Sequence, residues 1–140
     1  MNNNNILITG SSGQLGKSLT KFLHNRFNVI STCKNHDKFY AHEYILDITD
    51  RNSVKKCFSK FKPHIIINCA AYTNVDSSEI NKKNAHDVNV NGLKNIVQFS
   101  NKDAYIVQIS TDYVFDGNCG PYSEKDATYT DFDPSSFSQK

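Results

Sequence analysis

A short apolar segment near the N-terminus runs directly into a glycine-rich turn, and this junction constrains the fold most strongly. Ile6–Thr9 is predicted to be a buried strand, and the stretch Gly-Ser-Ser-Gly-Gln-Leu-Gly at 10–16 follows it without a gap. A helix is predicted after the turn, because four apolar side chains recur on one helical face: Leu15, Leu19, Phe22 and Leu23. A strand, a tight turn and a helix in this order predict the first unit of a helix-covered sheet.

The three glycines of this turn have separate predicted roles. Gly10 allows the tight turn, Gly13 removes a side chain where a pyrophosphate would approach the backbone, and Gly16 lets the helix pack close to the strand. A pyrophosphate would then lie on the N–H groups and positive dipole at the helix start. Dinucleotide binding is the favoured interpretation because the glycines lie between a strand and a helix. An ordinary glycine-containing turn remains the alternative.

Strand and helix patterns alternate along the rest of the chain. Further strands are predicted at 28–33, 43–46, 64–68 and 104–110, with helices at about 50–61 and 78–100. Asp50 is predicted to cap the first of these helices. Short connections between alternating elements indicate an α/β fold, a Rossmann-type doubly wound parallel sheet of about five strands with helices on both faces. Residues 1–116 are expected to form this domain, and 117–140 a loop and irregular tail.

Composition excludes several other classes. The 140 residues carry a net charge of +2 without a basic stripe, so no nucleic-acid partner is expected. No apolar run is long enough to span a membrane, and no secretory leader is evident, so a cytoplasmic location is expected. The four cysteines and five histidines lack the spacing of metal ligands, so no metal is assigned.

The end of the second predicted strand bears on the choice of cofactor. In proteins that bind NAD, an acidic residue at this position binds the ribose hydroxyls. This chain has Cys33 followed by Lys34, so a cation replaces the carboxylate. NADP(H) is therefore favoured, with Lys34 meeting the 2′-phosphate, and NAD(H) stays open. An equally weighted alternative is that Lys34 is a solvated surface side chain.

Four motifs occur in the order typical of one known family. They are the glycine turn at 10–16, Leu-Asp-Ile-Thr-Asp at 46–50, Asn-Cys-Ala-Ala-Tyr-Thr-Asn-Val-Asp at 68–76 and Ser-Thr-Asp-Tyr-Val-Phe-Asp-Gly at 110–117. The chain resembles the dTDP-4-dehydrorhamnose reductases, which are extended short-chain dehydrogenases/reductases, from Ile6 to about Thr128. The regulatory subunit of methionine adenosyltransferase is similar in the same places. The resemblance covers about the first half of a family member.

The resemblance implies a role for residues that follow the predicted strands. Cofactor contacts are expected at Gly10, Gly13, Gln14, Leu15, Gly16, Lys34, Asp47, Ile48, Ala71, Tyr72 and Thr73. Of these, Asp47 and Ile48 would flank the adenine, and the segment at 71–73 would line the ribose and nicotinamide, although core packing remains an alternative for Tyr72. Thr111 would be the catalytic hydroxyl on the substrate carbonyl, with Asp112 beside the sugar.

The chain departs from this family at the residue pair that supplies the proton in the reaction. The family uses a Tyr-x-x-x-Lys pair, in which tyrosine donates a proton to the carbonyl oxygen. Counting along the motif places this pair at Pro134 and Ser138, and none of the seven tyrosines is followed four residues later by lysine. The 140 residues are therefore expected to be catalytically silent or nearly so.

Three functional hypotheses remain open. The first is a reductase that acts on a nucleotide-sugar substrate, represented here by its cofactor-binding half. The second is a non-catalytic module, dinucleotide-binding or regulatory, that binds a dinucleotide or a partner protein. Whether the chain forms a homo- or hetero-oligomer stays open. The third is a truncated gene remnant, in which the fifth strand would form an edge with exposed apolar surface.

Overall fold

The computed structural model describes residues 5–35, 44–74, 77, 80–111, 115, 117–118 and 120–126. These residues belong to two compact units, the first ending at Gln108 and the second beginning at Ile109. The domain limit predicted at residue 116 stays a prediction. The first unit contains the sheet and all the α-helices described below, and the second contains the short 3-10 helix Glu124–Asp126 (η3).

The first unit is built on a five-stranded parallel sheet in the order β3-β2-β1-β4-β5. The strands are β1 (Asn5–Thr9), β2 (Asn28–Cys33), β3 (Tyr44–Ile45), β4 (Ile65–Asn68) and β5 (Tyr105–Gln108). The predicted Rossmann-type fold is thus confirmed, with β1 at the centre of the sheet. All the strands point the same way, so their carboxyl ends meet at one edge of the sheet, where parallel sheets bind their ligands.

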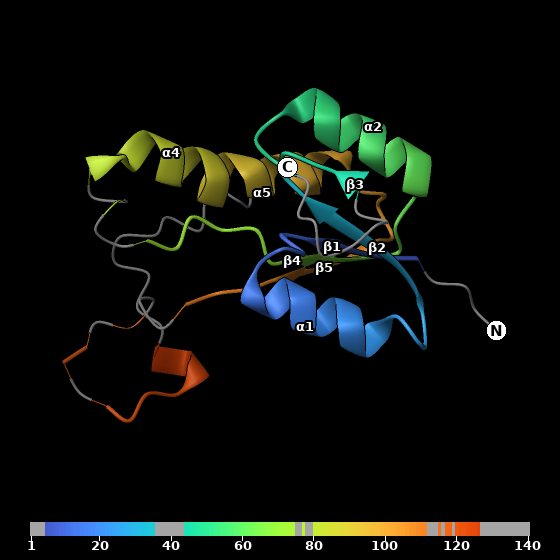
Figure 1. Cartoon of the computed structure of the whole chain (residues 1–140). Helices are drawn as coiled ribbons and strands as arrows, with labels where there is room; N and C mark the ends of the chain where they lie inside the picture. The colour runs from blue at the N-terminus through green and yellow to red at the C-terminus, as the bar shows by residue number, and fades with distance from the viewer. Residues whose placement is uncertain are drawn as a thin grey trace. The chain divides into compact units, whose positions relative to one another are not determined.

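Helices cover both faces of the sheet (Figure 1). On one face lies α1 (Gln14–Leu23), and on the other lie α2 (Arg51–Phe61) and α5 (Gly92–Phe99). A π-helix, η1 (Asp87–Asn91), joins α5 to the short α4 (Lys82–His86). A single helix was predicted over 78–100. The described part of this range is helical from Lys82 to Phe99, but the π-turn within it was not predicted.

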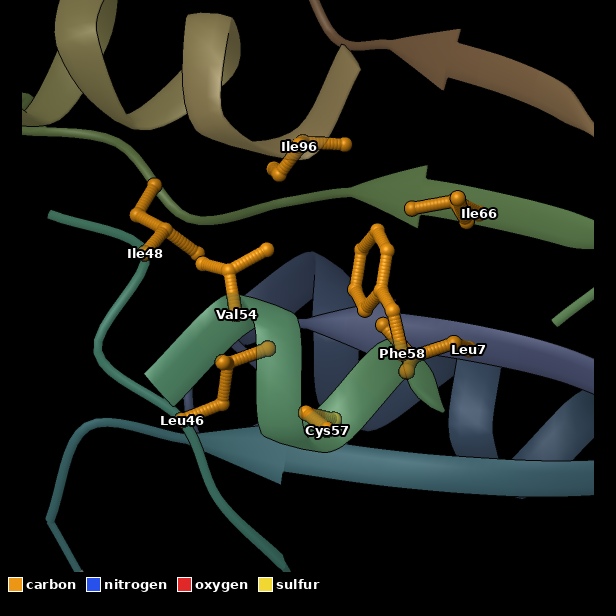
Figure 2. Packing of buried hydrophobic residues seen from close by; sticks show 8 residues of the cluster. All are labelled: Leu7, Leu46, Ile48, Val54, Cys57, Phe58, Ile66 and Ile96. Atoms are coloured by element: carbon orange, nitrogen blue, oxygen red, sulfur yellow. The ribbon is translucent and has the colours of Figure 1, made fainter. Parts of the chain in front are cut away.

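The hydrophobic core lies between the sheet and the α2–α5 layer (Figure 2). Its fully buried members are Leu7, Leu46, Ile48, Val54, Cys57, Phe58, Ile66 and Ile96. The apolar face predicted for α2 is confirmed, and so is its cap, because Asp50 Oδ1 accepts from the Asn52 N–H at 2.9 Å. Burial raises the pKa of the Cys57 thiol to about 12, so this side chain behaves as an uncharged apolar group.

The buried face of α1 differs from the prediction. Of the four apolar residues on the predicted face, Leu19 and Leu23 are half-buried, but Leu15 and Phe22 are 44% and 67% exposed. The buried residues of α1 are instead Gly16 and Thr20. A Cβ on Gly16 would clash with the carbonyl oxygen of Gly10, so the helix approaches the sheet through its small side chains. This close approach turns the two large side chains toward solvent.

Two features are absent from the part of the chain that the structure describes. No helix there is long and apolar enough to cross a membrane. No group of three or more histidine, cysteine, aspartate or glutamate side chains gathers there in a way that could hold a metal ion.

Candidate dinucleotide-binding site

The turn after β1 contains contacts that only glycine permits. Gly10 has a φ of 61°, and a Cβ on it would lie 2.8 Å from the backbone nitrogen of Ala70. The Ser11 N–H donates to the Thr32 carbonyl at 2.9 Å, which ties the turn to β2. Together with the clash at Gly16, these contacts confirm the tight turn and the close helix packing predicted for Gly10 and Gly16.

The N-terminus of α1 opens beside this turn. Gly13 is the N-cap residue, and no side chain among the described residues caps this helix start. Gly13, Gln14 and Leu15 are all exposed. The first N–H groups of a helix lack partners within it, and the helix dipole makes this end electropositive. The turn and helix start together provide the local geometry that binds a pyrophosphate in dinucleotide-binding folds.

The segment after β4 is held by one amide side chain from the π-helix η1. Asn89 Oδ1 accepts from the Tyr72 N–H at 2.8 Å, and Asn89 Nδ2 donates to the Tyr72 carbonyl at 3.1 Å. Both backbone groups of Tyr72 are therefore oriented by a single side chain. Ala71 and Thr73 are exposed on either side of it, while Tyr72 itself is half-buried. The residues predicted to line the ribose and nicotinamide thus lie at the carboxyl edge of the sheet.

The segment after β3 contains a tight turn built on Asp47. Asp47 Oδ1 accepts from the Thr49 N–H at 2.9 Å and from the Thr49 hydroxyl at 2.7 Å. The other oxygen, Oδ2, lies 3.0 Å from Lys34 Nζ. The structure therefore brings together two predicted cofactor residues, Lys34 and Asp47, as an ion pair. The Lys34 side chain is 65% exposed, so the alternative of a solvated surface lysine stays open beside its predicted role at the 2′-phosphate.

Several groups act on the pKa of Asp47. Partial burial tends to raise it, but hydrogen bonds from Thr49 and the nearby ammonium of Lys34 favour the charged form. The net result is a pKa below the ordinary value of 3.8. Asp47 is therefore a carboxylate at neutral pH, and only an acceptor of hydrogen bonds.

Ile48 has a different place from the one the resemblance implied for its side chain. It is 4% exposed and packs in the core near Val54 and Ile96 (Figure 2). A Cβ on Gly92 would lie 2.6 Å from Ile48 Cδ1, so the glycine makes room for this side chain under the helix. Only the backbone of Ile48 is left to face a ligand, and that contact stays a prediction.

A buried asparagine side chain also binds the backbone of the turn after β3. Asn95 is 5% exposed, and its Nδ2 donates to the Ile48 carbonyl at 2.8 Å and to the Thr49 carbonyl at 3.3 Å. Asn89 and Asn95 lie on one continuous helical stretch, η1 followed by α5. This stretch therefore holds both the turn after β3 and the segment after β4.

A row of polar side chains also joins the carboxyl ends of three strands. Thr9, Asn68 and Gln108 are register partners on β1, β4 and β5. The Thr9 hydroxyl donates to Asn68 Oδ1, and Asn68 Nδ2 donates to Gln108 Oε1 at 2.7 Å. Sequence reasoning missed this row and the two helix asparagines. The sequence signal for the row was weak: Thr9 and Asn68 are polar residues at the ends of predicted apolar strands, but Gln108 lies inside the strand predicted at 104–110.

The predicted substrate residues lie outside the first unit. Thr111 is exposed and belongs to the second unit. Asp112 lies outside the described residues. Their predicted roles stay predictions.

Strand order, glycine turn and helix start together define the class of the protein. They are the features of Rossmann-type dehydrogenase and reductase domains. A family model described as the RmlD substrate binding domain matches residues 4–134. The chain belongs to this family.

Individual relatives agree with the family. The chain is 40% identical over 125 residues to the dTDP-4-dehydrorhamnose reductase of Aggregatibacter actinomycetemcomitans, covering 86% of this chain and 40% of that protein. It is 32% identical over 125 residues to methionine adenosyltransferase 2 subunit beta of Danio rerio, covering 87% and 37%. A crystal structure of dTDP-4-dehydrorhamnose reductase from Bacillus anthracis in complex with NADP superimposes with a TM-score of 0.75 at 36% identity, covering 85% and 40%. The chain thus spans about two fifths of these relatives.

Proposed function

We propose that this chain binds a nicotinamide dinucleotide, with NADP(H) favoured over NAD(H), as the cofactor-binding part of a protein similar to dTDP-4-dehydrorhamnose reductase. The observation that carries the proposal is the glycine turn after the central strand β1, which leads into an exposed helix start without a side-chain cap. The relative from Bacillus anthracis, whose structure contains NADP, supports it.

The proposed contacts lie on the segments that follow β1, β3 and β4. They are Gly13, Gln14 and Leu15 at the pyrophosphate, Asp47 and the Ile48 backbone at the adenine, and Ala71, Tyr72 and Thr73 at the ribose and nicotinamide. The carboxylate of Asp47 accepts from the exocyclic amine of adenine. These segments share one edge of the sheet, so an extended dinucleotide can reach all three.

The reaction of the whole protein is proposed to be reduction of the C4 ketone of a nucleotide-linked 4-dehydro-6-deoxysugar. When bound, the nicotinamide would supply the hydride; Thr111 would donate a hydrogen bond to the ketone oxygen, and Asp112 would lie beside the sugar. A proton must also reach that oxygen, and the family's Tyr-x-x-x-Lys pair does not occur in these 140 residues. We therefore propose that the 140 residues bind the cofactor without reducing the ketone by themselves.

A second candidate is a non-catalytic binding or regulatory module. The missing Tyr-x-x-x-Lys pair favours it, and so does the 32% identity to methionine adenosyltransferase 2 subunit beta. Such a module would bind the dinucleotide and a partner protein. The two candidates differ in whether the full-length native product turns over a nucleotide-linked ketone.

The first test titrates the purified chain with NADPH and, separately, with NADH, and measures the binding by calorimetry. Gly13→Ala is expected to weaken binding by at least about ten-fold, because its methyl group occupies the space of the pyrophosphate. The variant should still fold, since the new Cβ would lie 3.3 Å from the Gly10 carbonyl oxygen, a contact that small adjustments relieve. Gly120→Ala, whose Cβ would meet nothing nearer than 3.6 Å, is the control and should bind as the parent does. Failure of the parent chain to bind either dinucleotide at millimolar concentration would contradict the proposal.

A further inference from the structure

The ion pair between Lys34 and Asp47 bridges the ends of two neighbouring strands. Lys34 follows β2 directly, and Asp47 lies just beyond β3. The strands are in register at Cys33 and Ile45, and the Leu46 N–H donates to the Cys33 carbonyl at 2.8 Å. The pair therefore lies at the carboxyl edge of the sheet, beside the place proposed above for the adenosine of the cofactor.

The two partners are not equally free to move. Asp47 Oδ1 is held by two hydrogen bonds from Thr49, and the Asp47 carbonyl accepts from the Asp50 N–H at 3.1 Å. Rotation of the carboxylate would break the bonds to Thr49. The Lys34 side chain is 65% exposed and has a long flexible stem, whereas that of Asp47 is 28% exposed. When the pair separates, the lysine moves and the aspartate stays.

Of the two oxygens of Asp47, only Oδ2 can therefore exchange one hydrogen-bond donor for another. Oδ2 accepts from Lys34 in this structure, and the same carboxylate is the proposed acceptor for the adenine amine. Lys34 in turn is the proposed cation for a 2′-phosphate. A partly exposed ion pair contributes little net stability, so it exchanges readily for a stronger partner. A phosphomonoester dianion is such a partner for an ammonium group.

We propose that Asp47 sets the cofactor preference by holding Lys34. With NADP(H), the ammonium moves from Asp47 Oδ2 to the 2′-phosphate. With NAD(H), it stays on the carboxylate. Since only NADP(H) must break the ion pair, Asp47 reduces the advantage that Lys34 gives to NADP(H). The inference rests on the proposed function, because it requires that the adenosine lies at this edge.

The test compares the ratio of the dissociation constants for NADH and NADPH across variants of the full chain. Asp47→Asn removes the charge but keeps a carbonyl oxygen that accepts from Thr49. It is expected to raise the ratio about three- to five-fold. Loss of the adenine contact affects both cofactors, and the comparison in the Lys34→Met variant below separates any unequal part of that loss from the effect of Lys34. Asp50→Asn is the matched control, because it removes a charge three residues away and retains the helix cap, so the ratio should not move.

The same substitution in a Lys34→Met variant shows whether the change in the ratio depends on Lys34. Lys34→Met is expected to lower the ratio, and adding Asp47→Asn to it should leave that ratio unchanged. If the ratio fails to rise in Asp47→Asn, or rises equally without the lysine, the inference is wrong. If the ratio fails to rise, the ion pair only joins two strands, and a lower Tm would be the only effect of Asp47→Asn. If the ratio rises equally without the lysine, the carboxylate of Asp47 repels the 2′-phosphate directly. If the parent chain binds neither dinucleotide, the proposed function fails and the inference with it.

Discussion

Asn95 is a polar side chain in the apolar layer between α5 and the sheet. It lies beside Ile96 of the core, yet its amide is bound to two carbonyls of the turn after β3. Ile48 is buried, and a buried carbonyl without a partner is costly. The side chain therefore fixes where the turn lies against the helix, in addition to any contribution to stability.

Replacing this amide tests that role. Asn95→Leu is expected to lower the free energy of unfolding by about 2 kcal/mol, because two carbonyl groups lose their donor. Urea unfolding followed by circular dichroism measures it. Asn91→Leu is the matched control: Asn91 binds Asp87 of its own helix, at 2.9 Å, so its loss should cost less than about 1 kcal/mol. Equal losses in the two variants would mean that the bonds to the turn are not the cause.

Whether the role of a residue could be predicted depends on how far away in the sequence its partners lie. The roles of Gly10 and Gly16 were predicted because the strand, turn and helix that require them are contiguous in the sequence, although Gly10 packs against the distant Ala70. Asn89 and Asn95 were not predicted, since their partners are backbone groups of distant segments, which leave no mark on side-chain patterns. Ile48 was assigned by resemblance to the cofactor, but its hydrophobic side chain is buried in the core.

Elements were predicted well where periodicity was strong. All five strands and the cap and apolar face of α2 agree with the patterns, although β5 ends at Gln108, two residues before the predicted limit. The π-turn of η1 was missed, because a widened turn changes the register of a helix without changing its composition. The buried face of α1 was misassigned, because hydrophobic periodicity gives no weight to the small residues through which this helix packs.

The end of α2 offers a test at the scale of elements. Lys62, the C-cap residue, has a φ of 44°, in the left-handed region that favours glycine. Lys62→Gly is expected to raise the free energy of unfolding by about 1 kcal/mol, because it relieves the contact between Cβ and backbone. Lys56→Gly, an exposed position inside the same helix, should lower it by about 1 kcal/mol. Thermal and urea unfolding measure both, and a loss of stability in Lys62→Gly would contradict this account.

At the scale of the whole first unit, the sheet is covered unevenly. Helix α1 packs on β1 and β2, whereas β5 lies at the edge of the sheet. On β5, Tyr105 is 78% exposed and Val107 is 44% exposed. Their register partners on β4, Ile65 and Ile67, are half-buried. In the described sheet β5 is therefore an edge strand with exposed apolar side chains, and such an edge favours pairing between chains.

This surface predicts how the chain behaves in concentrated solution. Tyr105→Lys combined with Val107→Lys is expected to reduce self-association, because charged side chains discourage edge-to-edge pairing. Light scattering against protein concentration measures it. The stability should change by less than about 1 kcal/mol, since both side chains are exposed. Ile80→Lys, at a position that is 85% exposed and outside the strands, is the control. If it reduces association as much as the double variant does, net charge is the cause and the edge is not.

The attachment of two loops to one helical stretch also limits how the length of the chain can vary. Asn89 lies in the π-turn and Asn95 in the regular helix that follows, and each binds a different loop. Deleting one residue between them would rotate one amide by about 100° relative to the other, so one loop would lose its bonds. Insertions and deletions among relatives are therefore expected within the loops and not between these two asparagines.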